Sequence, residues 1–373
     1  MPKLRKTLPK ELTDFCYGHT SWMPEDIEQC KEMLAPCDSN ARERGGYKET
    51  ALHKQIPLEI VEWLVERGAD VNAANTYGTP LFKHAAFGNY DICRFLIEHG
   101  ADVNVTAHAG HTPLFSAVSL RKCNCDIVRL LLEHGADPCH HSEHWDGSKT
   151  PLLYMLSRGA EAGEVSVDAA RLLIRAQKEK GGIPKDEWEK AQEYVSRMGH
   201  EFELYKNDMT GDFRRQREAV MKRYYAMFDV APAKPVIKHD GTSPIKVDDT
   251  LTVWEQHSAL WEFLVPSSGS CATVQGEVIR ITGRVDDESN RNGGANWDKE
   301  YRKMLEALTT YFLHGNALSG EEMEDAGHAI HEIDRCRGAC GCQKEIDQLA
   351  GLAVKWVSQN PEPVPLGKVP YNR

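Results

Sequence analysis

Glu66-Arg-Gly-Ala-Asp-Val-Asn72 returns as Glu98-His-Gly-Ala-Asp-Val-Asn104 and, with an altered ending, as Glu133-His-Gly-Ala-Asp-Pro-Cys139. A second phrase follows each copy, as Thr79-Pro-Leu, Thr112-Pro-Leu and Thr150-Pro-Leu, and Thr50-Ala-Leu opens the series. The two phrases recur with a period of about 33 residues, which indicates an array of similar structural units. Each unit of such an array buries its apolar face only against its neighbours.

The residues of one copy predict a pair of helices. Threonine is a good N-cap, and proline suits the first helical turn because its missing N–H has no partner there anyway. The first helix contains Lys83–Phe87 and should end at Gly88, which tolerates a left-handed backbone. The second, Asp91–Glu98, places Ile92, Phe95 and Leu96 on one face.

With this period and these two phrases, residues 10–180 resemble the ankyrin-repeat family. The resemblance implies an all-α solenoid that binds another macromolecule and carries out no chemistry. In the family's usual Thr-Pro-Leu-His, the histidine ties neighbouring repeats together. His53 keeps it, whereas Phe82, Phe115 and Leu153 stand at the equivalent positions. We therefore expect this stack to rely more on apolar contact than on that hydrogen bond.

The repeat phrases and their loss predict the domain organisation. We expect a solenoid over residues 1–228, a linker over 229–250, a second helical domain over 251–360 and an extended tail over 361–373. Within the solenoid we expect a degenerate N-terminal repeat (10–46), repeats over 47–180 and a helical cap over 181–228. Leu34–Ala41 imitates the Gly-Ala-Asp-Val-Asn turn, and Ala231-Pro-Ala-Lys-Pro235 breaks the helical pattern.

The second domain lacks both repeat phrases but keeps helical periodicity. Val274, Val278, Ile281 and Val285 follow a three-to-four spacing. We expect Asn296 to cap the next helix, and Ser319-Gly-Glu-Glu322 is a capping box. The stretch Val265–Arg280, with Arg291-Asn-Gly and Asn296-Trp-Asp298, resembles segments of uncharacterised bacterial proteins, some from toxin–immunity neighbourhoods. That resemblance implies a bacterial or phage origin.

The charge balance narrows the class of partner. The chain has 45 Lys and Arg against 56 Asp and Glu, a net charge of -11. This balance disfavours nonspecific nucleic-acid binding and favours a basic protein partner, although solubility alone also accounts for it. No apolar run is long enough to cross a bilayer, and no secretory signal is present. We therefore expect a cytoplasmic protein whose 11 cysteines are reduced thiols.

Two groups of residues are candidate binding sites. Aromatic side chains on exposed loops are frequent interaction hot spots, so we expect the partner to meet the repeat tips and first helices at Tyr77, His108, His111, Trp145, Lys83 and Phe87. In the second domain, a polar face contains Glu277, Arg280, Arg284, Asn292, Asn296 and Asp298. It is either a solvated ladder of ion pairs or a groove for a partner or a phosphorylated ligand.

Thiols and imidazoles also occur close together. Cys336, Cys340 and Cys342 follow His328 and His331, and a Cys139-His-His-Ser-Glu-His144 tip holds a similar mixture. The Cys-x3-Cys-x-Cys spacing is not that of a standard zinc site, and a helix end and a binding loop explain the two stretches without metal. The sequence predicts no metal and no cofactor.

The leading functional hypothesis is a non-enzymatic protein that binds a macromolecular partner through the ankyrin groove, with a bacterial immunity or anti-defence role as its specific version. One alternative is an enzyme or ligand-binding regulator whose second domain binds a small polar or phosphorylated ligand, with Glu277 and Asp298 as its carboxylates. Another is an assembly scaffold.

Overall fold

The computed structural model describes residues 4–18, 21–119, 124–143, 149–159, 164–267, 269–339 and 341–372. Within these ranges the backbone forms sixteen α-helices, and its one sheet pairs two parallel strands, β1 (Arg5–Thr7) and β2 (Cys37–Arg42). The predicted all-α fold is confirmed.

The first eleven helices are α1 (Leu12–Gly18), α2 (Pro24–Leu34), α3 (Leu58–Glu66), α4 (Pro80–Phe87), α5 (Tyr90–Glu98), α6 (Pro113–Ser119), α7 (Cys125–Glu133), α8 (Pro151–Ser157), α9 (Glu164–Lys180), α10 (Lys185–Tyr205) and α11 (Gly211–Phe228). Two short 3-10 turns, η1 (Ala51–His53) and η2 (His108–Gly110), lie among them. The remaining helices are α12 (Val253–Leu264), α13 (Val274–Asn292), α14 (Lys299–Tyr311), α15 (Gly320–Arg335) and α16 (Gln343–Gln359).

The chain divides into two compact units. The repeat unit is Met1–Phe202 with Met209–Ala233, and the second unit is Glu203–Asp208 with Lys234–Arg373. Among the described residues, no helix combines the length and the apolar character that a bilayer crossing requires.

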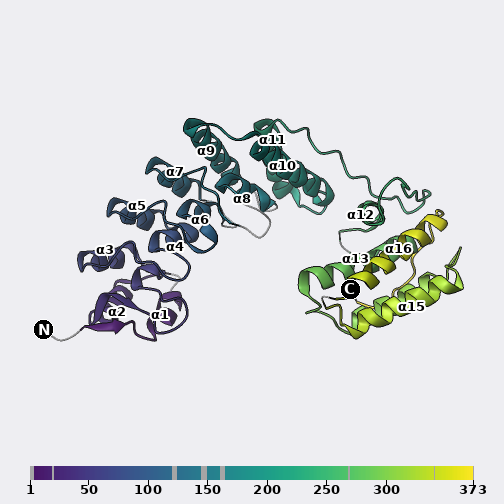
Figure 1. The fold of residues 1–373 in the computed structure, drawn as a ribbon, viewed down its shortest axis with the longest axis horizontal. Helices are drawn as coiled ribbons and strands as arrows, with labels where there is room; N and C mark the ends of the chain where they lie inside the picture. The colour runs from purple at the N-terminus through teal and green to yellow at the C-terminus, as the bar shows by residue number, and fades with distance from the viewer. Residues whose placement is uncertain are drawn as a thin grey trace. The chain divides into compact units, whose positions relative to one another are not determined.

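The repeat unit is a stack of helix pairs. Helices α3, α5, α7 and α9 form one row and α4, α6 and α8 form the other, and successive members of each row contact each other (Figure 1). The first helix of a repeat starts as predicted at α4 and α8. Thr79 Oγ1 accepts a hydrogen bond from Phe82 N, and Thr150 Oγ1 accepts one from Leu153 N. Gly88 ends α4 with a left-handed backbone at φ 79°.

A ladder of asparagine side chains joins the repeats. Asn72 Nδ2 donates to Gly100 O at 2.9 Å, while its Oδ1 accepts from Asp102 N at 2.8 Å. Asn104 makes the same two bonds to Gly135 and Asp137 one repeat later. In the N-terminal segment, Asn40 makes them to Gly68 O (3.2 Å) and Asp70 N (2.7 Å). One asparagine per repeat therefore satisfies two backbone groups of the next repeat.

Histidines add a second set of inter-repeat hydrogen bonds. His53 Nε2 lies 3.2 Å from Gly78 O, His84 Nε2 lies 2.9 Å from Leu52 O, and His140 Nε2 lies 2.8 Å from Gly110 O. His84 and His140 thus bond neighbouring repeats from positions outside the Thr-Pro-Leu-His motif, in addition to the apolar contacts between repeats.

These buried histidines predict an acid-sensitive repeat unit. Burial lowers the pKa of His53 and of His84 to about 4, from 6.5 in the unfolded chain. His84 Nδ1 faces Asn89 Nδ2 at 2.9 Å, an arrangement that suits a neutral ring. Because the folded pKa is depressed, the stabilisation is present above pH 6.5 and is lost as the pH falls towards 4.

Between pH 7 and pH 5.5, each histidine should lower the unfolding free energy by about 1 kcal/mol. Urea denaturation at the two pH values measures this loss. A His84→Gln variant should show a smaller loss than the wild type, whereas the exposed His99→Gln control should match the wild type. Equal stability of the wild type at both pH values would contradict the assignment of neutral buried rings.

The second unit is a helical bundle built around α13 and α16, which pack against each other. Helix α12 contacts both, α14 contacts α13 and α15, and α15 also contacts α16. The predicted capping box is present, because Ser319 Oγ accepts from Glu322 N and Glu322 Oε2 accepts from Ser319 N. The expected cap of α14 needs correction: Asp298, not Asn296, accepts the hydrogen bonds from Glu300 N and Tyr301 N.

The segments on either side of the bundle are non-helical and partly packed. Residues 229–250 contain no helix, and Ile245 is buried with its N–H donated to Pro361 O at 2.7 Å. The tail beyond residue 360 lies along the start of α13, where Val274 N donates to Val364 O and Leu366 N donates to Ala272 O.

Candidate partner-binding site

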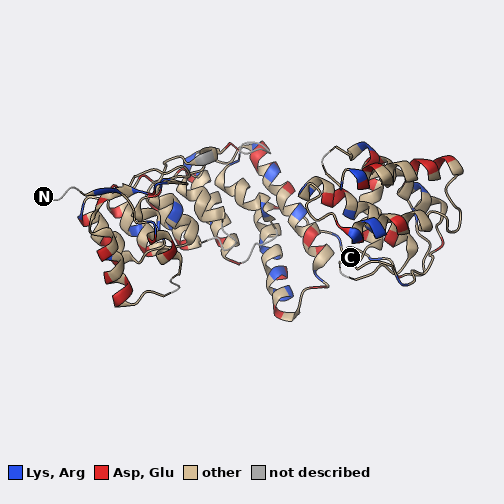
Figure 2. Cartoon of the chain, turned by 90° about the horizontal axis from the view of Figure 1, so that it is seen from below, with Lys and Arg blue, Asp and Glu red and all other residues tan. Residues whose placement is uncertain are grey.

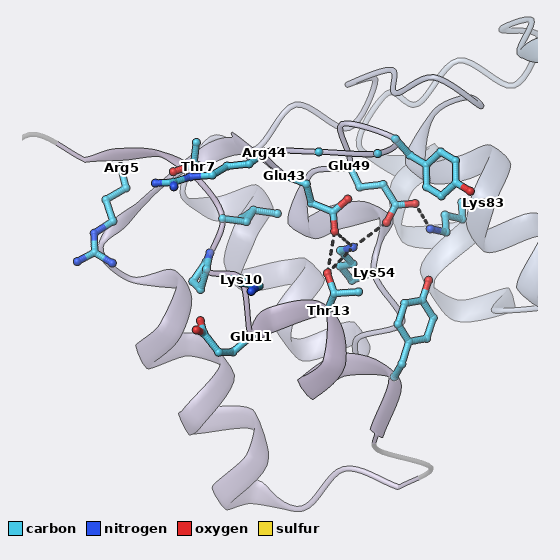
Figure 3. Close-up of a pocket in the computed structure, with 16 residues that line it drawn as sticks. Arg5, Thr7, Lys10, Glu11, Thr13, Glu43, Arg44, Glu49, Lys54 and Lys83 are labelled. Atoms are coloured by element: carbon cyan, nitrogen blue, oxygen red, sulfur yellow. Dashed lines mark hydrogen bonds and ion pairs between the residues drawn. The ribbon is translucent and has the colours of Figure 1, made fainter.

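A cleft of about 1130 Å³ opens at the N-terminal end of the repeat unit. Side chains between Arg5 and Tyr17 line one side, and the loop Glu43–Glu49 lines the other. Lys54, which follows η1, and Lys83, which lies on α4, complete the lining (Figure 3). The cleft thus collects side chains from the N-terminal segment and the first two helix pairs.

A buried charge network forms the wall near Lys54. The Lys54 side chain is 1% exposed, and its Nζ donates to Glu43, to Glu49 at 2.8 Å and to Thr13 Oγ1 at 3.0 Å. Thr13 Oγ1 donates to Glu43 at 2.7 Å, and Lys83 Nζ pairs with the other oxygen of Glu49 (Figure 3). Two cations and two carboxylates therefore neutralise each other.

The network holds Glu49 and Lys54 ionised. Burial alone would raise the pKa of Glu49, but the hydrogen bonds from Lys54 and Lys83 outweigh burial and keep that pKa below its usual value. Burial alone would lower the pKa of Lys54, yet its bonds to Glu43 and Glu49 raise it. Since its members come from α1, the 43–49 loop, the end of η1 and α4, the network fixes the cleft wall.

The outer part of the cleft is more basic than its wall. Arg5, Lys10 and Arg44 are exposed, and none of these side chains makes an ion pair with a described residue. In Figure 3, Arg44 lies along one side of the cleft, with Lys10 and Glu11 opposite. The whole lining contains five basic and three acidic side chains. A local positive excess therefore lies within a chain of net charge -11.

Two tyrosines make an aromatic pair at the tips of adjacent repeats. The Tyr47 and Tyr77 rings meet edge to face with centroids 4.6 Å apart, and the residues are 51% and 47% exposed. Tyr47 also lines the cleft. Its carbonyl accepts from Thr76 N at 3.1 Å, which holds the two tips together. Such a rigid, amphipathic pair suits a protein interface.

The comparison with known families accounts for this architecture. Residues 23–107 and 51–142 match the family described as Ankyrin repeats (3 copies). Residues 23–142 form ankyrin repeats. Similar proteins include the human and mouse Notch-regulated ankyrin repeat-containing proteins, each 34% identical over 69 residues. The match covers 18% of this chain and 60% of each relative's length. Ankyrin repeats are protein–protein interaction modules, and residues 23–142 therefore indicate such a module in this chain.

The other side chains predicted to contact the partner lie in different environments. On α4, Phe87 is 36% exposed, and Nζ of the half-buried Lys83 lies 5.7 Å from the centre of its ring while pairing with Glu49. His111 is not a free-standing tip residue, because it stacks on Phe115 with ring centroids 5.0 Å apart and meets Tyr154 edge-on. The side chain of His108 and all of Trp145 lie outside the described residues.

The predicted polar face of the second unit needs correction. Glu277 and Arg280 are 0% and 2% exposed, and Arg280 Nε donates to Glu277 Oε2 at 2.9 Å. Tyr371 in the tail donates its hydroxyl to Glu277, and the Arg280 guanidinium lies 5.8 Å over the Tyr371 ring. Every residue from Val274 to Thr282 is buried, because the tail and α16 cover this part of α13. The pair is therefore internal and does not form a solvated ladder.

The remaining residues of that face hold a loop together. Buried Glu288 accepts from Asn292 Nδ2 at 3.0 Å and from Asn296 N at 2.6 Å, while Asp298 caps α14. Arg284 is half-buried. The structure thus does not bring the six predicted residues together into one face.

The candidate metal ligands are described only in part. Among the described residues, no group of three or more His, Cys, Asp or Glu is placed to hold a metal ion. Cys340 and His144 lie outside the described residues. Cys336 ends α15, and Cys342 precedes α16, so these thiols stand at helix ends.

Sequence reasoning missed the cleft as a whole. Its cations Arg5, Lys10 and Arg44 lie before the first complete repeat or in a loop. The signal that pointed nearest to them was the degenerate turn Leu34–Ala41, which placed a repeat-like element upstream of the first Thr-Ala-Leu phrase.

Proposed function

We propose that this chain is a non-enzymatic binding protein whose ankyrin solenoid takes a protein partner at the N-terminal tips and first helices. The exposed Tyr47–Tyr77 pair carries the proposal, because two adjacent aromatic rings stay in solvent instead of entering the core. Phe87, the last residue of α4, is a further exposed aromatic side chain of the same repeat as Tyr77. The acidic net charge supports basic patches on the partner over the rest of the solenoid, and a cytoplasmic setting suits the free thiols.

We further propose that the repeat unit and the second unit are separate domains, joined through the irregular chain at 229–250. Each unit has its own apolar core, one within residues 8–228 and one within residues 245–371. This separation gives the second unit freedom to bind at another point on the same partner.

The enzyme alternative loses support from its carboxylates. Glu277 is buried and engaged by Arg280 and Tyr371, and Asp298 is engaged as a helix cap. Glu277 is therefore inaccessible to a substrate, and the carboxylate of Asp298 already accepts the capping hydrogen bonds of α14.

The finer proposal is a bacterial immunity or anti-defence role. It is supported by the acidic balance and by the resemblance of Val265–Arg280 to bacterial segments. The similar proteins found are from human and mouse, so the proposal draws nothing from them. Co-expression with a toxin encoded beside the gene tests it, and survival of the cells is the expected result.

The binding proposal is tested in two steps. A partner is captured on the immobilised chain and identified by mass spectrometry, and its affinity is then measured for a Tyr77→Ala, Phe87→Ala double variant. We expect a loss of at least about 30-fold, since a truncated aromatic hot spot costs about 2 kcal/mol or more.

A further inference from the structure

We propose that the N-terminal cleft binds an acidic peptide segment of the partner, with Lys10 and Arg44 taking its carboxylates and Tyr47 taking an adjacent apolar or aromatic side chain. This inference rests on the proposed function and names the chemistry of one part of the same surface. The net charge of the chain suggests a basic partner, but this cleft alone would bind an acidic segment.

The charged side chains of the cleft divide into a neutralised wall and a basic open part. Lys54 and Lys83 are occupied by Glu43 and Glu49, so the wall of the cleft is already neutral. Lys10, Arg44 and Arg5 remain exposed without ion-pair partners among the described residues, and Glu11 is the one acidic lining residue outside the network. The open part of the cleft therefore presents three cations and one anion.

Arg44 and Lys10 can bind carboxylates in two different ways. Arg44 offers a planar guanidinium that can hold a carboxylate through two parallel hydrogen bonds, and Lys10 offers a compact charge across the cleft. The wall beside them is fixed by the Lys54 network, whose members come from α1, the 43–49 loop, the end of η1 and α4. A volume of about 1130 Å³ accommodates several residues of an extended peptide.

A peptide is favoured over a nucleic acid for a physical reason. Glu11, Glu43 and Glu49 line the same cleft, and a continuous phosphate backbone would pass close to all three. A peptide can place its carboxylates singly beside Arg44 and Lys10 and direct neutral side chains at the acidic positions. The exposed ring of Tyr47 at the cleft edge adds an apolar contact that suits such a segment.

The test is selection of phage-displayed random dodecapeptides on the immobilised full chain. We expect the selected peptides to be acidic and to contain an aromatic or large apolar residue. Synthetic fluorescein-labelled copies should bind the wild type by fluorescence polarisation. Their affinity should fall at least 10-fold for a Lys10→Glu, Arg44→Glu variant and should weaken between 50 and 300 mM salt.

A matched control carries the same change of charge elsewhere. Lys185→Glu, Lys222→Glu reverses two side chains that are 90% and 73% exposed on α10 and α11. Peptide affinity for this variant should match the wild type, and circular dichroism should show all three proteins folded. Equal losses in the two charge variants would mean that net charge alone drives binding, which overturns the cleft assignment.

The remaining outcomes are equally decisive. Selection of neutral or basic peptides, or of none, overturns the inference, and so does a single-stranded DNA dodecamer that displaces the peptide with equal affinity. If neutral or basic peptides are selected while partner binding still depends on Tyr77 and Phe87, the cleft inference fails and the proposed function stands. If acidic peptides bind the cleft but the partner ignores Tyr77 and Phe87, the proposed tip interface fails.

Discussion

Lys54→Met should destabilise the repeat unit by about 3–5 kcal/mol, which is the usual cost of removing one partner from a buried charge network. The Lys54 ammonium is 1% exposed and neutralises Glu43 and Glu49, so its removal leaves two carboxylates with only Lys83 nearby. Urea denaturation followed by circular dichroism measures the change. The transition of the second unit should stay where it is in the wild type.

Lys222→Met is the matched control, because Lys222 pairs with Glu218 on an exposed surface and should leave the midpoint unchanged. The charge origin of the Lys54 effect also has a pH signature. Because Lys54 and Lys83 hold the pKa of Glu49 below its usual 4.5, the difference in unfolding free energy between wild type and Lys54→Met should narrow as the pH falls below 4.5. A gap that is independent of pH would show that lost packing, not charge, destabilises the variant.

Arg280→Ala should destabilise the second unit by a similar 3–5 kcal/mol, because it leaves the fully buried Glu277 without its cation. It should also loosen the tail, since Tyr371 binds Glu277 and lies against the guanidinium. Thermal denaturation should show a lower midpoint for the second unit, with the repeat unit unaffected.

Two comparisons make this prediction specific. Arg291→Ala removes a cation that is 81% exposed and paired with Asp287, and it should leave the midpoint unchanged. Replacing both members of the buried pair, as in Glu277→Met with Arg280→Met, should recover most of the stability lost in Arg280→Ala. If Arg280→Ala melts like the wild type, the result would contradict the burial of the Glu277–Arg280 pair.

The sequence predicted the elements whose causes are local. The Thr-Pro-Leu starts and the Ser319 capping box involve residues three positions apart, so their partners can be found in the sequence. Helices α10 and α11 follow from continuous periodicity, and they occupy Lys185–Tyr205 and Gly211–Phe228 within the helical cap expected over 181–228. The asparagine ladder was also within reach, because Asn72 and Asn104 hold the same place in the repeated phrase.

The parts that escaped prediction depend on distant partners. Glu277 and Arg280 have the spacing of a surface ion pair. The pair is enclosed in part by Tyr371, which lies 94 residues further along the chain and donates its hydroxyl to Glu277. Lys54 meets Thr13 across 41 positions, and nothing in either local sequence indicates this contact. Tyr77 could be predicted as an exposed tip residue, but its partner Tyr47 lies outside the repeated phrases.

The measurement that tests the central claim most directly is isothermal titration calorimetry of the captured partner against the full chain and against the Tyr77→Ala, Phe87→Ala variant. Both substituted side chains are exposed, so the variant should melt like the wild type, and Tyr205→Ala, at a residue 51% exposed, serves as the control. The account predicts a loss of at least about 30-fold in affinity for the double variant and none for the control. Unchanged affinity in the double variant would contradict an interface at the N-terminal tips and first helices.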